Sequence, residues 1–353
     1  MTNAKRFAIS EKTISPRNRK KKGQGMTMRV LVIGAGGMAN SHFEAYSHMP
    51  DVELVAIADT NYIVAQRAAA RFSCKAFQNA DEMLQTCHAD AVDLCIPSFL
   101  HYTYTMKCLK MGLHVFCEKP MAHTAEEADE MIAFARKQNL FLGIGQVLRF
   151  WPEYQTLKKM VLQEPYGPLR FLKLDRQFGT HEKGSWYMDP DKCKMVCFEM
   201  HIHDSDFVNY LFGLPDAVDS IGVEEPNIHM SYISTRYLYD NRNTVIIGEG
   251  GWSDSTLEFA GGYKAVFEHA VLEYKNGSVT LYAANATPEV LDMRCPEEMP
   301  SDIYGVYTEL SEFYGAIAGT TANRTVTAES ARNTIRIVEK EYQSVQQRKA
   351  LRV

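Results

Sequence analysis

Residues 29–144 show two hydrophobic patterns that alternate along the chain. Short runs of consecutive apolar residues predict buried strands of a parallel sheet, and the longer mixed stretches between them predict helices. The strands are expected at 29–33, 53–58, 91–97, 113–117 and 140–144, and the helices at 38–47, 64–72, 81–87, 102–111 and 124–138. This alternation predicts an α/β fold in which residues 28–148 form a Rossmann domain with a doubly wound parallel sheet.

The second half of the chain has a different pattern. Segments 244–250, 263–274 and 278–283 have strand-like composition, and Asn276-Gly277 is a strong signal for a hairpin turn. Helices are expected at 196–212, ending before Gly213, and at 328–348. A chain of 353 residues is long for one core. We therefore expect a second, α+β domain over residues 149–353.

A glycine-rich turn follows the first predicted strand. Gly34, Gly36, Gly37, Met38 and Ala39 fit the pattern G-x-G-x-x-G/A. In such a turn the first glycine permits the bend, the second lets the backbone approach a pyrophosphate, and a small residue lets helix and strand pack closely. Asp59 ends the next strand at the spacing expected for a carboxylate on the adenosine ribose. This favours NAD over NADP; the alternative is an ordinary strand–helix turn.

Two further polar segments follow predicted strands of the same sheet. They are Pro97-Ser98-Phe99-Leu100-His101 and Glu118-Lys119-Pro120. Ligands of doubly wound sheets bind beyond the carboxyl ends of the strands, where both segments are expected to lie. Pro120 restricts the backbone of Lys119 to extended or turn conformations. This restriction would hold the lysine side chain at the edge of the sheet.

Residues 197–206, CFEMHIHDSD, are dense in groups that bind metals or transfer protons. If 196–212 is an α-helix, Glu199 and His203 share a stripe, whereas His201 and His203 face opposite ways. The two histidines then cannot bind one metal ion. A site made of Cys193, Cys197 and His201 is conceivable, but the Cys-x-x-x-Cys spacing is unusual for zinc. We therefore expect no metal.

Composition and charge exclude several classes of protein. The chain is 46% hydrophobic and 23% charged, its net charge is −5, and no apolar run reaches the length of a membrane span. We expect no nucleic-acid or membrane partner. Residues 1–27 carry eight basic residues and one acidic residue, which suggests a disordered extension. Eight scattered cysteines suit a reduced protein in the cytoplasm.

The run Gly112-Leu113-His114-Val115-Phe116-Cys117-Glu118-Lys119-Pro120 closely resembles a signature of one oxidoreductase family. The chain is similar to the glucose–fructose oxidoreductase, inositol dehydrogenase and rhizopine catabolism (Gfo/Idh/MocA) family. Further matches are the glycine turn, Ile96-Pro97-Ser98 with His101, Arg149-Phe150, Trp186, the polar helix, Glu309-Leu310 and Phe313. The resemblance implies a C-terminal domain with a large, mostly antiparallel open sheet that is covered by forming a homo-oligomer.

The resemblance also implies roles for individual residues. Lys119 would hydrogen-bond the reacting hydroxyl, Glu118 would contact the nicotinamide side, and His203 would be the general base with Glu199 as its partner. The expected cofactor-binding residues are Gly34, Gly36, Gly37, Met38, Ala39, Asp59, Pro97, Ser98, His101, Glu118 and Lys119. The chain departs from the family pattern at Glu199, where an Asp is usual, and at Cys193-Lys194-Met195, where the family is often glycine-rich.

The expected function is NAD-dependent oxidation of a secondary hydroxyl, at C3, of a sugar, polyol or glycoside. Weaker candidates for the sugar pocket are Arg149, Arg176, Trp186, Tyr187 and Lys194. Two alternatives stay open. One is an NAD-dependent glycosidase that works by oxidation and elimination, and the other is a non-catalytic sensor of sugar or dinucleotide.

Overall fold

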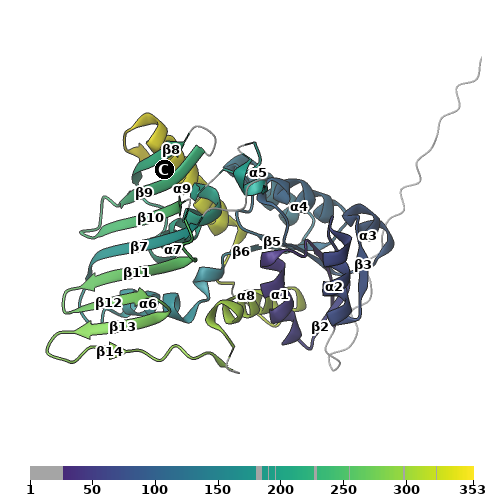
Figure 1. Cartoon of the computed structure of the whole chain (residues 1–353), viewed down its shortest axis with the longest axis horizontal. Helices are drawn as coiled ribbons and strands as arrows, with labels where there is room; N and C mark the ends of the chain where they lie inside the picture. The colour runs from purple at the N-terminus through teal and green to yellow at the C-terminus, as the bar shows by residue number, and fades with distance from the viewer. Residues whose placement is uncertain are drawn as a thin grey trace, which may run out of the picture.

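A computed structural model of the chain describes residues 27–179, 185–189, 191–194, 196–225, 229–253, 255–296, 299–322 and 324–353. Of the features considered above, residues 1–26 of the basic extension and Met195 lie outside the described residues. The first described half forms a parallel α/β layer, and the second half forms a broad sheet beside it (Figure 1).

The N-terminal domain is built on a parallel sheet, as the sequence predicts, but it has six strands rather than five, because the short strand over Lys75–Phe77 was not predicted. Its strands, in spatial order, are β3 (Lys75–Phe77), β2 (Val52–Ala58), β1 (Met28–Ile33), β4 (Ala91–Leu94), β5 (His114–Glu118) and β6 (Leu142–Gly145). The strand order reverses at the junction between β1 and β4, which is where such sheets bind ligands. The ends of β1, β4 and β5 therefore meet at this point.

Five helices connect these strands, and their ends follow local capping chemistry. They are α1 (Gly37–Ser47), α2 (Tyr62–Phe72), α3 (Ala80–Thr86), α4 (His101–Lys110) and α5 (Ala125–Lys137). The Thr124 hydroxyl accepts a hydrogen bond from the backbone N–H of Glu127. The Glu127 carboxylate in turn accepts a hydrogen bond from the N–H of His123. In a capping box this bond would come from the N–H of Thr124, one residue later. This exchange fixes the chain just beyond Lys119.

The C-terminal domain contains a nine-stranded sheet that is mostly antiparallel. Its strands, in spatial order, are β14 (Glu289–Val290), β13 (Ser278–Ala283), β12 (Ala270–Lys275), β11 (Ala260–Phe267), β7 (Leu169–Gly179), β10 (Val245–Ser253), β9 (His229–Leu238), β8 (Ala217–Glu225) and β15 (Leu351–Arg352). Segment 263–274 forms two antiparallel strands rather than one. The turn at Asn276-Gly277 joins β12 to β13 with positive φ at both residues, so that prediction is confirmed.

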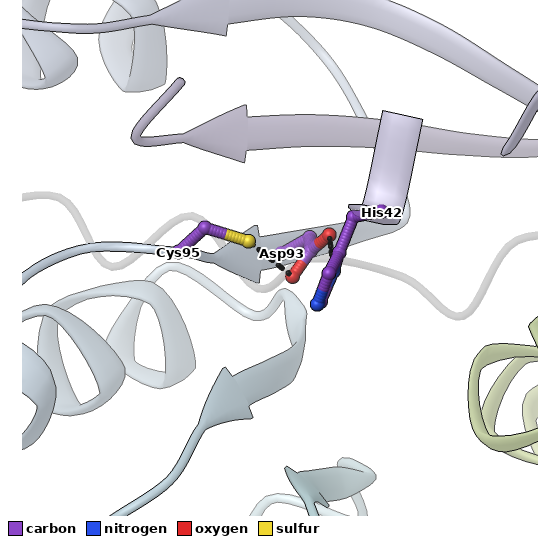
Figure 2. Close-up of side chains that lie close together, drawn as sticks. All are labelled: His42, Asp93 and Cys95. Carbon is purple, nitrogen blue, oxygen red and sulfur yellow. Dashed lines mark hydrogen bonds and ion pairs between the residues drawn. The ribbon is translucent and has the colours of Figure 1, made fainter. Parts of the chain in front are cut away.

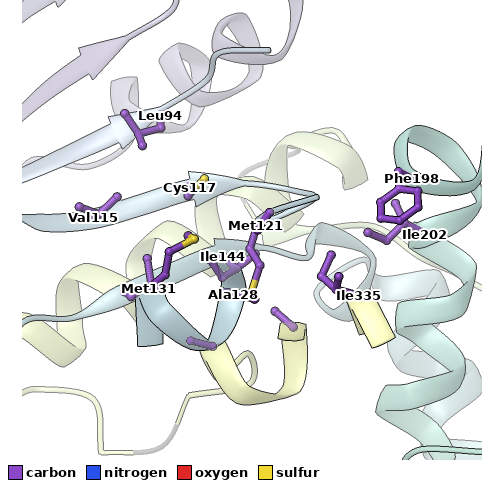
Figure 3. Packing of buried hydrophobic residues seen from close by; sticks show 14 of the residues in the cluster. Leu94, Val115, Cys117, Met121, Ala128, Met131, Ile144, Phe198, Ile202 and Ile335 are labelled. Atoms are coloured by element: carbon purple, nitrogen blue, oxygen red, sulfur yellow. The ribbon is translucent and has the colours of Figure 1, made fainter. Parts of the chain in front are cut away.

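Four further α-helices complete the domain and join it to the first one. They are α6 (Pro152–Gln163), α7 (Ile202–Phe212), α8 (Ser301–Ala318) and α9 (Ala328–Gln347). Helix α8 packs against α1 of the Rossmann domain, and α9 runs from α5 to β8. Buried residues of both domains share one core, in which Met121 and Ile144 lie near Phe198, Ile202 and Ile335 (Figure 3). This shared core fixes the polar helix against the end of the parallel sheet.

None of the helices in the described ranges combines the length and the apolar character that a membrane crossing requires.

Candidate active site

The glycine-rich turn leaves space in front of the first residues of α1. Gly34 has a φ of 96°, and a Cβ there would lie 2.1 Å from the carbonyl oxygen of Cys95, so only glycine fits. A Cβ at Gly36 or Gly37 would meet nothing within 4 Å. Ala39 is fully buried beneath the turn, while Met38 is partly exposed. The open approach to the helix N-terminus fits a dinucleotide pyrophosphate.

Asp59 lies beside this turn and is held by two backbone donors. Its Oδ2 accepts a hydrogen bond from the N–H of Ala35 at 2.8 Å, and its Oδ1 accepts one from the N–H of Asn61 at 2.7 Å. The carboxylate is half-buried. Because both bonds orient it at the end of β2, the residue fits the ribose-binding position predicted for it.

The segment after β4 is tied to the segment after β5. Pro97 precedes a short 3₁₀ helix, Ser98–Leu100. The ring nitrogens of His101 lie 2.6 Å from the carbonyl oxygen of Pro120 and 2.8 Å from that of Ile96. His101 is buried, and burial lowers its pKa. These contacts show His101 bracing the two loops from within.

Lys119 emerges at the end of β5, immediately before a cis peptide bond to Pro120. Its ammonium group donates to the backbone carbonyl of Glu199 at 2.5 Å and lies 3.9 Å from the Glu199 carboxylate. The Ser98 hydroxyl donates to the same carboxylate, and His123 lies 3.1 Å from that hydroxyl. Three segments that are far apart in sequence therefore meet at Glu199.

The polar helix differs from the prediction in its first turn. Cys197–His201 form a π-helix, and the α-helix begins at Ile202. A uniform step of 100° per residue does not apply across this turn, so the shared stripe of Glu199 and His203 does not follow from that step and stays a prediction. Glu199 reaches Ser98 and Lys119, and burial raises the pKa of its carboxyl group.

His203 is half-buried in the first turn of α7. Its Nδ1 is buried and has no hydrogen-bond partner among the described residues. Burial, together with the charges of Lys119 and Arg176, lowers the pKa of His203 well below 6.5. The imidazole is therefore neutral near pH 7 and able to accept a proton, with the Lys119 charge close enough to affect it.

His201 lies on the other side of the helix, inside the C-terminal core. Its Nε2 is 3.2 Å from the hydroxyl of Tyr237 and 3.4 Å from the carboxylate of Glu341. The Cys197 thiol contacts the sulfur of Met230 at 3.2 Å. Within the described part of the chain, Cys193, Cys197 and His201 do not form one of the metal-competent groups. His201 is therefore a packed core residue.

Arg149 and Arg176 lie in the interior rather than in a sugar pocket, which corrects the sequence-based prediction. Arg149 makes a two-pronged ion pair with Asp206, at 2.8 and 2.7 Å, and Arg176 makes one with Asp204, at 3.2 and 3.0 Å. Both side chains are at most 2% exposed. Their donors are directed at these carboxylates, so both arginines fix α7 in place.

Aromatic residues lie near the Glu199 carboxylate. The rings of Trp186 and Tyr187 are stacked, with 3.9 Å between their centroids, and the centroid of the Trp186 ring lies 6.0 Å from that of Phe99. Burial, followed by the nearby charge of Glu199, raises the pKa of Tyr187. These observations place the aromatic pair beside Glu199 and the segment after β4.

Lys194 lines a separate, partly open pocket with an empty volume of about 690 Å³. The pocket is bordered by His123, Cys193, Lys194, Phe198, Glu339, Tyr342 and Gln343. Burial, followed by the charge of Lys194, lowers the pKa of His123 to about 4. His123 was not among the predicted site residues. Its position four residues after Lys119 could have indicated that it lies near the site.

Comparison with known families identifies the chain. Residues 28–146 match the description "Oxidoreductase family, NAD-binding Rossmann fold", and residues 154–287 match the GFO/IDH/MocA C-terminal domain. The two segments together cover well over half of the chain. The chain belongs to the Gfo/Idh/MocA oxidoreductase family. The family resemblance drawn from the sequence is therefore confirmed. The predicted fold class, a Rossmann domain followed by a domain with a mostly antiparallel sheet, is confirmed as well.

Among curated proteins, the chain is 31% identical to UDP-N-acetylglucosamine 3-dehydrogenase of Acidithiobacillus ferrooxidans over 56% of its own length and 58% of the relative's. It is 32% identical to D-glucoside 3-dehydrogenase of Escherichia coli over 55% and 56% of the two lengths. The chain thus spans little more than half the length of these relatives. A mouse trans-1,2-dihydrobenzene-1,2-diol dehydrogenase matches at 25% identity over 75% of this chain and 89% of the relative.

Solved structures show that the whole fold is shared. The Acidithiobacillus ferrooxidans UDP-N-acetylglucosamine 3-dehydrogenase superposes with a TM-score of 0.73 at 23% identity, covering 91% of this chain and 98% of the other. Levoglucosan dehydrogenase in complex with NADH and levoglucosan superposes with a TM-score of 0.79 at 17% identity, covering 92% and 99%. At these identities the likeness establishes the fold.

Proposed function

We propose that this protein is an NAD-dependent dehydrogenase that oxidises a secondary hydroxyl group, at C3, of a sugar, polyol or glycoside. The observation that carries the proposal is the contact of Lys119 with Glu199 beyond the parallel sheet, with the imidazole of His203 within range of the Lys119 charge. The glycine turn and Asp59 lie at the same end of this sheet. A cation, a carboxyl group and a neutral imidazole are thereby held beside a dinucleotide-type fold.

In the oxidative direction His203 takes the hydroxyl proton, because its lowered pKa keeps the imidazole neutral at physiological pH. Lys119 stabilises the oxygen as it loses that proton. Only one of the three N–H donors of Lys119 is directed at the Glu199 carbonyl, which leaves donors for a substrate. Glu199 holds the lysine in place, and Ser98 in turn holds the Glu199 carboxylate. NAD bound at the glycine turn and Asp59 would supply the hydride acceptor.

The preference for NAD over NADP rests on Asp59. A carboxylate at the end of β2 accepts hydrogen bonds from the two ribose hydroxyls and repels a 2′-phosphate. Its two bonds to backbone N–H groups hold it at that position. The predicted cofactor contacts at Gly34, Gly36, Gly37, Met38 and Ala39 follow from the space in front of α1.

A sugar substrate is supported by the relatives and by the aromatic residues. Two of the curated relatives are named as 3-dehydrogenases of sugar derivatives. Trp186 and Tyr187 offer flat apolar surfaces of the kind that cover the C–H face of a sugar ring. We place the ring between this pair and Lys119. Lys194 would contact a substituent that extends toward its pocket.

We further propose that the open sheet is covered by a second copy of the chain. Ile221 and Val223 on β8 and Val290 on β14 are 73%, 53% and 68% exposed. Exposed apolar residues on an uncovered sheet mark association surfaces. Light scattering coupled to size-exclusion chromatography should give a mass above that of the 40.0 kDa chain. A monomer would contradict this part of the proposal.

The function is tested by incubating the protein with NAD, or NADP, and a panel of free hexoses, inositols and glycosides. NADH absorbance and product mass are read together. A product lighter by two hydrogens with matching NADH formation supports the dehydrogenase. Bond cleavage without net NADH would instead indicate a glycosidase. If no compound of the panel reacts although the protein binds NAD tightly, and Lys119→Ala does not change that binding, the protein is a sensor.

A further inference from the structure

A buried group of ionisable side chains lies beneath the proposed cofactor site. His42, on α1, is fully buried, and its Nδ1 lies 2.8 Å from the Oδ2 of Asp93 on β4 (Figure 2). Its Nε2 lies 3.0 Å from the Oε1 of Glu118 on β5. One imidazole therefore bridges two carboxylates that belong to neighbouring strands of the sheet.

The bridge ends at the backbone of Lys119. The Oε2 of Glu118 accepts a hydrogen bond from the N–H of Lys119 at 3.2 Å, so both carboxylate oxygens of Glu118 are engaged. Gly145 on β6 makes this geometry possible, because a Cβ there would lie 2.6 Å from Glu118 Oε1. The orientation of Glu118 is thus set by His42 on one side and by the Lys119 backbone on the other.

The protonation of His42 follows from this arrangement. A neutral imidazole has one N–H donor, whereas both ring nitrogens here face carboxylate oxygens, and only the imidazolium donates to both. Burial opposes this charge, but the neighbouring Asp93 carboxylate and Cys95 outweigh it and raise the pKa of His42 well above 6.5. The stabilised charge is the one that faces Glu118.

The other ionisable groups around the bridge come from two helices and from the end of one strand. The Tyr46 hydroxyl of α1 donates to Asp93 at 2.8 Å and lies 2.7 Å from the Tyr314 hydroxyl of α8. The Cys95 thiol, just after β4, lies 3.6 Å from Asp93. Burial, followed by the charge of Glu118, raises the pKa of Glu309 on α8, which keeps that carboxyl neutral. The net charge of the group is therefore set by His42, Asp93 and Glu118.

His42, Asp93 and Cys95 also have the residue types and proximity of a metal site. Their atoms, however, already form a complete hydrogen-bonded set with Tyr46 and Glu118 at ordinary distances. A metal ion would have to displace the proton on Nδ1 and separate the His42–Asp93 pair. The geometry therefore favours a proton-bearing bridge.

We propose that His42 and Asp93 are positioning residues that hold the Glu118 carboxylate in a fixed orientation, and that through it they fix the turn carrying Lys119. Asp93 orients the imidazole and stabilises its positive charge, and the imidazolium in turn orients Glu118. The consequence for cofactor binding rests on the proposed function, since it requires Glu118 to face the nicotinamide side of bound NAD. The charge state of His42 does not depend on that function.

The charge state is tested on the unaltered protein by long-range ¹H–¹⁵N NMR with ¹⁵N-labelled histidine at pH 8. His42 is assigned as the signal that disappears in His42→Gln. We expect both of its ring nitrogens to carry protons at this pH. A neutral His42 ring at pH 7, or a metal stoichiometrically bound to the purified protein, would overturn the proposal.

The effect on Glu118 is tested by calorimetric titration with NAD at pH 7.5. In His42→Gln and Asp93→Asn, the Glu118 carboxylate loses the imidazolium that donates to its Oε1, so its orientation is no longer fixed. We expect NAD affinity to fall roughly tenfold, as for the loss of a hydrogen bond to a charged group. Tyr46→Phe removes a neutral hydrogen bond to the same Asp93 and should leave NAD affinity within about threefold.

Equal NAD affinities in all four proteins would contradict the positioning role, provided that circular dichroism shows the variants folded. Failure of the unaltered protein to bind NAD at any pH would instead refute the proposed function. In that event the NMR result still decides whether the His42–Asp93 pair is charged. The two proposals can therefore fail separately.

Discussion

Two pairs of polar residues on one helical stretch, within eight positions of each other, are used in different ways. Asp204 and Asp206 are fully buried, and each is saturated by an arginine that holds it with two hydrogen bonds. Glu199 contacts Ser98 and Lys119, whereas the buried Nδ1 of His203 has no partner among the described residues. The paired aspartates fix the position of the helix, and the unpaired nitrogen of His203 is the group to which we assign the chemistry.

The largest effect is expected for His203→Gln. Removing a general base costs about 10²–10⁴-fold in rate, and His203 makes no hydrogen bond through Nδ1 whose loss would unfold the protein. We expect kcat to fall by about that factor while Tm stays unchanged. Initial rates of NADH formation and a thermal melt measure the two quantities. A fall in Tm with a normal rate per folded molecule would show that His203 is structural.

Lys119→Met should be next in size. The methionine keeps the length of the side chain but removes the charge that stabilises the alkoxide, which costs about 10²–10³-fold in kcat. NAD affinity, measured by calorimetry, should change by less than about threefold, because the loss falls on the transition state. Unaltered kcat would contradict the role of Lys119 in the reaction and would favour a sensor.

Asp206→Ala tests the saturated set. The change leaves the Arg149 guanidinium buried without its carboxylate and also removes the bond from Thr334. Breaking a buried ion pair by removing one partner costs about 3–5 kcal/mol. Urea unfolding should show this loss. The control is Asp292→Asn, which removes the partner of an exposed arginine, Arg294, and should leave the urea midpoint unchanged.

The pH dependence of the unaltered protein sharpens the same comparison. A base must be deprotonated to act, and the pKa of His203 is lowered well below 6.5 by burial and by Lys119. The acid limb of kcat/KM should therefore lie below pH 6.5, with a plateau through neutrality. An acid limb above pH 6.5 would show that the pKa of His203 is not lowered, or that another group is the base.

The smallest effect is expected for Asp59→Asn, which leaves the turn nearly isosteric but removes the charge that repels a 2′-phosphate. The ratio of kcat/KM for NAD to that for NADP should fall by about tenfold, a change of about 1.4 kcal/mol in discrimination. Steady-state kinetics with both cofactors give this ratio. An unchanged ratio would show that Asp59 does not determine the choice between NAD and NADP.

Much of the fold could be predicted because its signals are local. The strands and helices of the Rossmann domain, the glycine turn and the hairpin at Asn276-Gly277 each follow from neighbouring residues. Segment 263–274 was treated as one strand-like stretch, although Glu268 and His269 interrupt its apolar residues; the structure places the break between two strands at these residues. Strands β3, β7, β8, β9, β14 and β15 and helices α6 and α8 were not predicted.

The site was predicted less completely, since its contacts are long-range. Nothing near Arg149 or Arg176 in sequence indicates that their carboxylate partners lie 57 and 28 residues away. The same holds for His42, whose partners lie 51 and 76 residues further along the chain. The sequence also does not indicate the π-helical turn at Cys197–His201, whereas the predicted directions of the side chains assumed regular α-helical steps. Spacing identified the residues but not all of their neighbours.

The central claim is that one helix separates chemistry from structure at positions only three residues apart. The most direct test compares His203→Gln and Asp206→Asn in single-turnover hydride transfer with saturating NAD, normalised to the folded fraction. We predict that His203→Gln abolishes most of the transfer with an unchanged Tm, and that Asp206→Asn lowers Tm but keeps a rate within about threefold of the unaltered protein. Equal losses of rate in both variants would contradict the claim.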